Sequence, residues 1–134
     1  MGVIGKIFKG FFSLNLMSRR EDCIFCKMAR GEIPSEKICE NDNFFSILDR
    51  NQDIKGHALV ISKRHFFNTL DLPSLVGADF LECIKETSLK LMKNYNAGGF
   101  NMLGNNFKSA GQIVEHFHVH ILPRKDEDGV SVVG

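Results

Sequence analysis

Hydrophobic residues alternate with histidines near the end of the chain, in the segment His116–Leu122. Its three histidines are spaced by two residues, and Phe117, Val119 and Ile121 follow them in turn. Because successive side chains on a strand point to opposite faces, the alternation predicts a strand with apolar residues packed beneath one face. We therefore expect the three imidazoles to line the other face and to look into one site.

Shorter apolar runs predict four further strands, at residues 37–40, 44–48, 58–61 and 100–103. The first two flank the polar turn Asn41-Asp42-Asn43, which indicates a β-hairpin. The third is a continuous apolar run, typical of a central strand. We expect these runs and the histidine strand to form an antiparallel sheet of about five strands.

Apolar residues at helical spacing predict one long helix after Pro73, of about five turns. Its apolar side comprises Leu75, Phe80, Leu81, Ile84, Leu91 and Met92. The run Asn96-Ala97-Gly98-Gly99 ends it. A short helical turn follows Cys23 and stops at Gly31. Together with the sheet, these helices predict an α+β fold.

The first part of the chain differs in composition from the rest. Residues 1–20 contain lysines and arginines but no acid, and they place Ile and Phe at helical spacing. We assign residues 1–21 to an N-terminal amphipathic extension and residues 22–134 to one domain. The extension fits an organelle presequence, a membrane-surface helix or a segment docked on its own domain. Lys9 interrupts its apolar stretch, which is too short to span a bilayer.

Length and charge narrow the class of protein. The chain has 134 residues, 43% of them hydrophobic, which suits one globular domain with a real core. A net charge of +1 gives no field that would favour nucleic acid as a partner. Four cysteines do not resemble a secreted disulfide framework and favour a reducing compartment. We expect a cytoplasmic protein with the extension docked, or a mitochondrial one if the extension is a presequence.

Cys23 and Cys26 form a Cys-x-x-Cys pair. Two thiolates at this spacing can bind one tetrahedral Zn²⁺, with histidines from elsewhere completing the site. A redox pair and an unmetallated apolar turn are the alternatives. Cys39 and Cys83 are interpreted as core residues.

The motifs together resemble the histidine triad (HIT) superfamily of nucleotide hydrolases and transferases, in its zinc-bearing bacterial-type branch. The residues that carry the resemblance are Cys23-x-x-Cys26, Asp49, Gly56-His57, Lys63-Arg64-His65, Asn105-Asn106, Ala110-Gly111-Gln112 and His116-x-His118-x-His120-Ile121-Leu122. The last motif matches the family pattern His-φ-His-φ-His-φ-φ, with φ apolar, at every position. All three histidines are kept, as in the hydrolase branches.

The resemblance implies a nucleotidyl hydrolase acting on purine nucleoside phosphoramidates or dinucleoside polyphosphates. His118 matches the nucleophile, which attacks the α-phosphorus and forms a nucleotidyl-histidine that water then hydrolyses. His120 and His57 would hold and neutralise the phosphoryl oxygens. The family also implies a two-fold homodimer whose sheets and long helices meet across the axis.

Four further residues match nucleotide-binding positions of the family. Asp49 would accept hydrogen bonds from the ribose hydroxyls. Asn105 and Gln112 would supply neutral donors to phosphate. Gly111 would let the backbone come close to the ligand.

His116 matches a residue that orients the nucleophile. In the zinc-bearing members it also completes a metal site, which here would comprise Cys23, Cys26, His65 and His116. We expect a structural Zn²⁺, because four protein ligands leave no position for water.

Two residues depart from the family pattern. Gln52 stands where many members have Pro, and Ile113 stands where the phosphoramidase branch usually has Ser. Because Ile113 cannot donate a proton, it leaves the preferred leaving group open. Two other functions also remain open: a nucleotide-binding interaction module with little turnover, and a metalloenzyme that uses the three histidines as a His₃ zinc face.

Overall fold

The structure is a computed structural model that describes residues 21–131. Apart from Glu21, the predicted N-terminal extension lies outside the described residues. Within this part of the chain, no helix has both the length and the hydrophobicity needed to cross a membrane.

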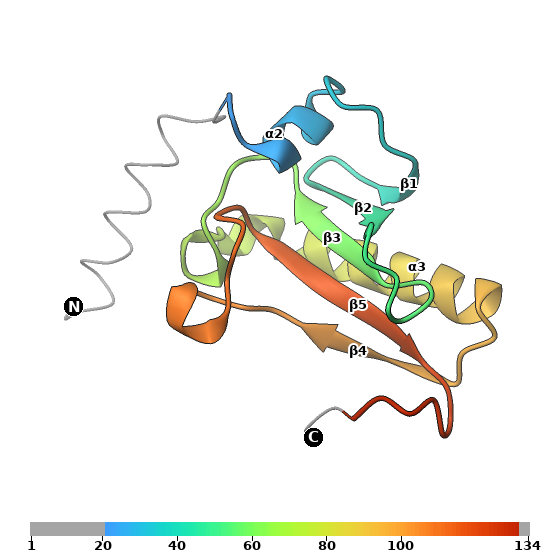
Figure 1. Cartoon of the computed structure of the whole chain (residues 1–134). Helices are drawn as coiled ribbons and strands as arrows, with labels where there is room; N and C mark the ends of the chain where they lie inside the picture. Colours follow the sequence, from blue (N-terminus) through green and yellow to red (C-terminus); the bar gives the residue numbers. More distant parts are fainter. Residues whose placement is uncertain (1–20, 132–134) are drawn as a thin grey trace.

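Within residues 21–131, five antiparallel strands form one sheet (Figure 1). The strands are β1 (Lys37–Glu40), β2 (Phe44–Leu48), β3 (Ala58–Ser62), β4 (Gly99–Leu103) and β5 (His118–Arg124). Their order in the sheet is β1-β2-β3-β5-β4, so β4 lies at one edge and β5 beside the central β3. This confirms the predicted α+β fold and the expected number of strands.

In the described part of the chain, two α-helices accompany the sheet, α2 (Ile24–Ala29) and α3 (Gly77–Asn94). The long helix begins later than predicted, because Ser74–Val76 forms a 3₁₀ turn instead of its first turn. Leu75, expected on the buried side, is accordingly 93% exposed. Cys83, Ile84 and Leu91 supply the buried face of α3.

The sheet separates two apolar clusters. One contains Phe44, Val60 and Val119 together with the buried residues of α3. The other contains Phe45, Leu59 and Ile61 together with Phe25 and Met28 of the α2 segment. Because strand side chains alternate between faces, β5 directs Val119 and Ile121 toward α3 and places His118 and His120 on the opposite face.

The expectation that three histidines line one site is wrong for His116. Strand β5 begins at His118, and the side chain of His116 is fully buried in the segment before it. There the backbone of Phe117 pairs with the end of β3 and with the chain that follows it. The Phe117 N–H donates to the carbonyl of Phe66 (2.7 Å), and the Phe117 carbonyl accepts from Ser62 N–H (3.3 Å). The His116 ring consequently belongs to a second cluster of side chains, described below.

Candidate functional site

An open cavity of about 420 Å³ lies against the histidine face of β5. The residues that line it come from α2, the end of β2, β3, β5 and the loop before β5: Ile24, Phe25, Met28, Ile47, Leu48, Asp49, Arg50, Leu59, Asn105, Gly111, Gln112, Ile113, Val114, His118 and His120. Most of these are apolar, whereas Asp49, Arg50, Asn105, Gln112 and the two histidines are polar. A cavity of this kind can hold a flat, partly apolar ligand that carries a polar group at one end.

His118 is held by a backbone acceptor. Its Nδ1 lies 2.7 Å from the carbonyl oxygen of His116. A carbonyl only accepts, so Nδ1 carries the proton and Nε2 of the neutral ring keeps its lone pair. Burial lowers the pKa of His118, which favours this neutral form. The Phe25 ring packs edge-on against the imidazole, with 5.2 Å between ring centroids.

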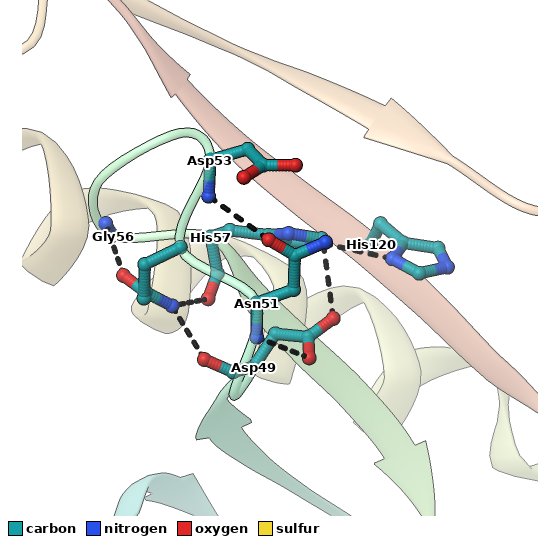
Figure 2. A network of polar contacts seen from close by, with 7 residues as sticks. Asp49, Asn51, Asp53, Gly56, His57 and His120 are labelled. Atoms are coloured by element: carbon teal, nitrogen blue, oxygen red, sulfur yellow. Dashed lines mark hydrogen bonds and ion pairs between the residues drawn. The ribbon is translucent and has the colours of Figure 1, made fainter.

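His120 forms a pair with His57, which precedes β3 (Figure 2). Nδ1 of His120 lies 2.8 Å from Nε2 of His57, and the same Nε2 is 3.5 Å from Oδ2 of Asp49. Burial, together with the neighbouring His118 and His57 rings, lowers the pKa of His120 to about 4. The predicted residues Asp49, His57 and His120 thus lie together, with a neutral His120 at pH 7.

The loop between β2 and β3 brings Asp49 next to His57. The N–H of Asp49 donates to the carbonyl of His57 (2.8 Å). Gly56, just before His57, has φ +85°, and a Cβ there would lie 2.7 Å from the Tyr95 ring and 3.0 Å from Pro123. Glycine is therefore required by the conformation and by the space available.

The loop that follows β4 contains the other predicted nucleotide-binding residues. Asn105 and Gly111 line the cavity, and Gly111 has φ +93°. Gln112, predicted to donate to phosphate, also lines the cavity but is only 8% exposed. Its Nε2 donates to the carbonyls of Phe67 (2.7 Å) and Val114 (3.1 Å), and its Oε1 accepts from Phe107 N–H (2.8 Å). The Gln112 side chain thus holds the loop together, so its donors are already used.

Cys23, Cys26, His65 and His116 form a separate, largely buried cluster. His116 Nδ1 is 3.3 Å from Cys23 Sγ, 3.5 Å from Cys26 Sγ and 3.2 Å from His65 Nδ1, and Cys26 Sγ is 3.2 Å from His65 Nδ1. A tetrahedral site with Zn–S of about 2.3 Å and Zn–N of about 2.0–2.1 Å separates nitrogen from its neighbouring ligand atoms by roughly 3.3–3.6 Å. The four residues therefore fit a zinc ion.

Protonation in this cluster also suits a metal. Nε2 of His116 lies 2.7 Å from the carbonyl oxygen of Ser62, so Nε2 donates and Nδ1 keeps its lone pair. The hydrogen bond with Cys26, followed by those with His116 and His65, holds the pKa of the Cys23 thiol far below its usual value, although burial opposes the shift. A thiolate and a free imidazole lone pair are the donors that zinc prefers.

The geometry argues against a His₃ zinc face. Among the described residues, the histidines of the triad are divided between two clusters, with His116 beside the cysteines and His120 beside Asp49 and His57. Asp49, His57 and His120 are also close enough together to be ligands of one metal ion. The 2.8 Å between the His57 and His120 nitrogens is, however, a hydrogen-bond distance, shorter than the N–N separation of about 3.3 Å at tetrahedral zinc.

Phe25 and Ser62 belong to the site but were not assigned a role from the sequence. Phe25 packs against His116 and His118, with ring centroids 5.6 and 5.2 Å away, and so separates the two clusters. Its position between the two cysteines was the available signal. The backbone carbonyl of Ser62 accepts a hydrogen bond from His116 Nε2–H, and a residue of any type could supply this carbonyl. No sequence signal could have identified it.

Comparison with known proteins agrees with this fold and site. Residues 30–127 match the HIT domain family, to which the chain therefore belongs. An adenosine 5'-monophosphoramidase of Candida albicans is 38% identical over 115 residues, which cover 83% of this chain and 76% of the relative. An adenylylsulfatase of Arabidopsis thaliana is 39% identical over 109 residues, which cover 81% of this chain and 55% of the relative.

The solved structures lead to the same family. The crystal structure of a Zn-bound histidine triad family protein from Mycobacterium smegmatis superposes with a TM-score of 0.76 at 33% sequence identity. The match covers 82% of this chain and 80% of that one. The resemblance seen in the sequence is thereby confirmed.

Proposed function

We propose that this protein is a nucleotidyl hydrolase that cleaves purine nucleoside phosphoramidates or dinucleoside polyphosphates through a covalent intermediate on His118. The observation that carries the proposal is the orientation of His118, whose Nδ1 donates to a carbonyl and whose Nε2 keeps its lone pair beside the cavity. The names of two relatives, a monophosphoramidase and an adenylylsulfatase, support hydrolysis at a nucleotide phosphate.

In the first step, Nε2 of His118 attacks the α-phosphorus. A P–N bond to the imidazole forms, and the bond from phosphorus to the leaving amine or phosphate breaks. The leaving group takes up a proton from solvent, which reaches the open cavity. The His116 carbonyl, which accepts from Nδ1, stabilises the positive charge that develops on the ring.

In the second step, water attacks the same phosphorus and displaces the imidazole. The water gives its hydroxyl group to phosphorus and releases one proton to solvent, which balances the proton taken up in the first step. The products are a nucleoside monophosphate and neutral His118. Splitting one displacement into two lowers each barrier, because imidazole is both a good nucleophile and a good leaving group at phosphorus. His57 and His120 would hold the phosphoryl oxygens, and Asp49, whose side chain is 24% exposed, would accept from the ribose hydroxyls.

A structural Zn²⁺ would be held by the cluster of Cys23, Cys26, His65 and His116. When bound, the ion would cross-link distant parts of the chain. It would carry no catalytic water, because four protein ligands fill its tetrahedral coordination. The residues themselves fix the His116 backbone, whose carbonyl accepts from His118.

A homodimer through β4 and α3 is the assembly we propose. Edge strand β4 exposes Phe100 (39%) and Met102 (50%), which pair with residues of β5 that face α3. Helix α3 also exposes Leu81 and Leu89. An apolar edge strand of this kind favours association. Sedimentation should give a dimer that Met102→Glu dissociates, and a wild-type monomer would contradict this assembly.

The test of the activity is a reaction of the pure protein with adenosine 5'-phosphoramidate and with diadenosine polyphosphate. We expect release of AMP and, after rapid acid quenching, a mass increase of one adenylyl group in wild type but not in His118→Ala. Binding without turnover would support an interaction module instead. Turnover that a chelator abolishes, with no adduct formed, would support a metalloenzyme.

A further inference from the structure

The side-chain amide of Gln52 closes the loop between β2 and β3. Its Nε2 donates to the carbonyl oxygens of Asp49 (2.5 Å) and His57 (3.0 Å). Its Oε1 accepts from the backbone N–H of Gly56 (2.8 Å). A primary amide has two N–H donors and one oxygen acceptor, so every polar group of this side chain ties one part of the loop to another.

The two ends of this loop hold residues that the proposed mechanism uses. The His57 carbonyl accepts both from Gln52 and from the N–H of Asp49 (2.8 Å). The His57 ring extends from the same residue and places Nε2 2.8 Å from Nδ1 of His120. The direction of the His57 ring is therefore set by a backbone segment that Gln52 fixes at three points.

Gln52 itself lies outside the cavity. It is exposed and does not line the 420 Å³ cavity, whereas Asp49 and His120 do. Any effect that Gln52 has on the reaction must consequently pass through the residues that it holds.

We propose that Gln52 is a positioning residue, which sets the His57–His120 pair by closing the loop. The proposal rests on the proposed function in so far as this pair serves the phosphoryl group. A displacement of a catalytic group by about 1 Å can reduce a rate up to about a hundredfold. Loss of the three hydrogen bonds that Gln52 makes would allow such a displacement.

The test compares Gln52→Ala and Gln52→Glu with the matched control Asn51→Ala. Glu keeps the length of the side chain and an acceptor for Gly56 N–H, but it loses both donors and points a carboxylate at two carbonyls. Asn51 lies in the same exposed loop, and within the described residues its Oδ1 accepts only from Asp53 N–H (3.1 Å). Asn51→Ala therefore removes one hydrogen bond inside the loop and keeps those that join the two ends of the loop.

We expect kcat for adenosine 5'-phosphoramidate to fall about tenfold in both Gln52 variants, with KM within about twofold of wild type. Asn51→Ala should keep the wild-type kcat. Equal kcat values in Gln52→Ala and Asn51→Ala would overturn the proposal. So would a loss of activity that disappears at a lower temperature, at which the variants are fully folded.

The ¹⁵N chemical shifts of the His57 and His120 ring nitrogens give a readout independent of turnover. They should change in Gln52→Ala and Gln52→Glu and remain as in wild type in Asn51→Ala. Unchanged shifts in the Gln52 variants would overturn the positioning of the pair. If wild type cleaves neither substrate, the proposed function fails, whereas the shifts still decide whether Gln52 positions the two rings.

Discussion

Nδ1 of His118 lies 2.7 Å from the carbonyl oxygen of His116. The ring of the same His116 turns its Nδ1 toward Cys23 and Cys26 and its Nε2 toward the Ser62 carbonyl. One residue therefore belongs to two sites, through its side chain to the cysteine and histidine cluster and through its backbone to the candidate nucleophile. A substitution of the His116 side chain would act first on the cysteine and histidine cluster, because the contact with His118 is made by the His116 backbone. The two sites can therefore be tested separately.

Replacing His118 by Ala should abolish turnover and spare binding. We expect kcat to fall by at least about a thousandfold, because the nucleophile that forms the intermediate is gone. The Kd for AMP should stay within about threefold of wild type, because the rest of the cavity wall, Asp49 included, is unchanged. Steady-state kinetics and calorimetric titration measure the two quantities. Retention of most of the activity would exclude the covalent mechanism.

Protein purified without chelator should contain about one Zn²⁺ per chain, held by the cluster of Cys23, Cys26, His65 and His116. The double variant Cys23→Ser, Cys26→Ser should lose the metal, because serine does not supply the thiolates that zinc requires. Elemental analysis measures the metal content. The variant should also unfold at a lower temperature, because metal binding contributes to folding stability.

Cys83→Ala is the matched control for the zinc experiment. Cys83 is a fully buried free cysteine outside the cluster, so its removal disturbs packing but leaves all four ligands in place. This variant should keep its metal even if its stability falls. Unchanged zinc content in the Cys23 and Cys26 double variant would rule out the assigned site.

Acid should destabilise the folded protein partly through His120. Its pKa is lowered from 6.5 to about 4, chiefly by burial. Between these pH values the unfolded chain binds a proton that the folded protein does not, so the free energy of unfolding falls as pH drops from 6.5 toward 4. Urea unfolding at pH 7 and pH 5 measures the decrease, which should be smaller in His120→Gln. An identical decrease in both proteins would refute the assignment.

Gly56→Ala should destabilise the protein and misplace His57. The new Cβ would approach the Tyr95 ring to 2.7 Å in a backbone with φ +85°. We expect a loss of about 2 kcal/mol in the free energy of unfolding and a lower kcat. Gly77→Ala is the control, because Gly77 begins α3 and a Cβ added there would have nothing within 4 Å, so stability should be unchanged or slightly higher. Equal stabilities of the two variants would contradict the steric argument.

Ile113→Ser should improve cleavage of phosphoramidates. Ile113 lines the cavity and is 91% exposed, so a hydroxyl at this position can reach a leaving amine. We expect kcat to rise about tenfold for adenosine 5'-phosphoramidate, and less for diadenosine polyphosphate, whose leaving group needs less help from a proton donor. Ile113→Ala provides the same truncation without the hydroxyl. If both variants raise kcat equally, space and not proton donation is the cause.

Strand boundaries were the features best predicted from the sequence. The bounds of β1 and β2 agree with the prediction, because a polar turn separates two runs that are long enough to pair. The start of α3 did not agree, since a proline can begin an α-helix or precede a 3₁₀ turn, as Pro73 does here. Local pattern also missed the start of β5, where pairing of Phe117 with Phe66 in a distant loop decides the outcome.

The sequence predicted which residues form the candidate site better than it predicted the contacts that they make. Spacing alone identified the Cys23 and Cys26 pair, and the family resemblance supplied His65 and His116 as partners, which the structure brings within 4.8 Å. The use of the Gln112 amide could not be predicted, because its partners are backbone groups of two loops whose approach depends on the whole fold. Side-chain identity sets what a residue can bond to, and the fold sets which partner is present.

With a metal bound, the cluster would also determine how this domain opens locally. Cys23 and His116 are 93 residues apart, so a metal between them would tie the beginning of the domain to the segment just before its last strand. Helix α2 has six residues, too few to persist alone, and its Phe25 is packed over His118. In hydrogen exchange, α2 would then open as a unit whose stability is set by the metal, whereas the amides of β3 and β5 would exchange only when the whole sheet unfolds. A chelator would thus loosen one wall of the nucleotide cavity long before it unfolds the domain.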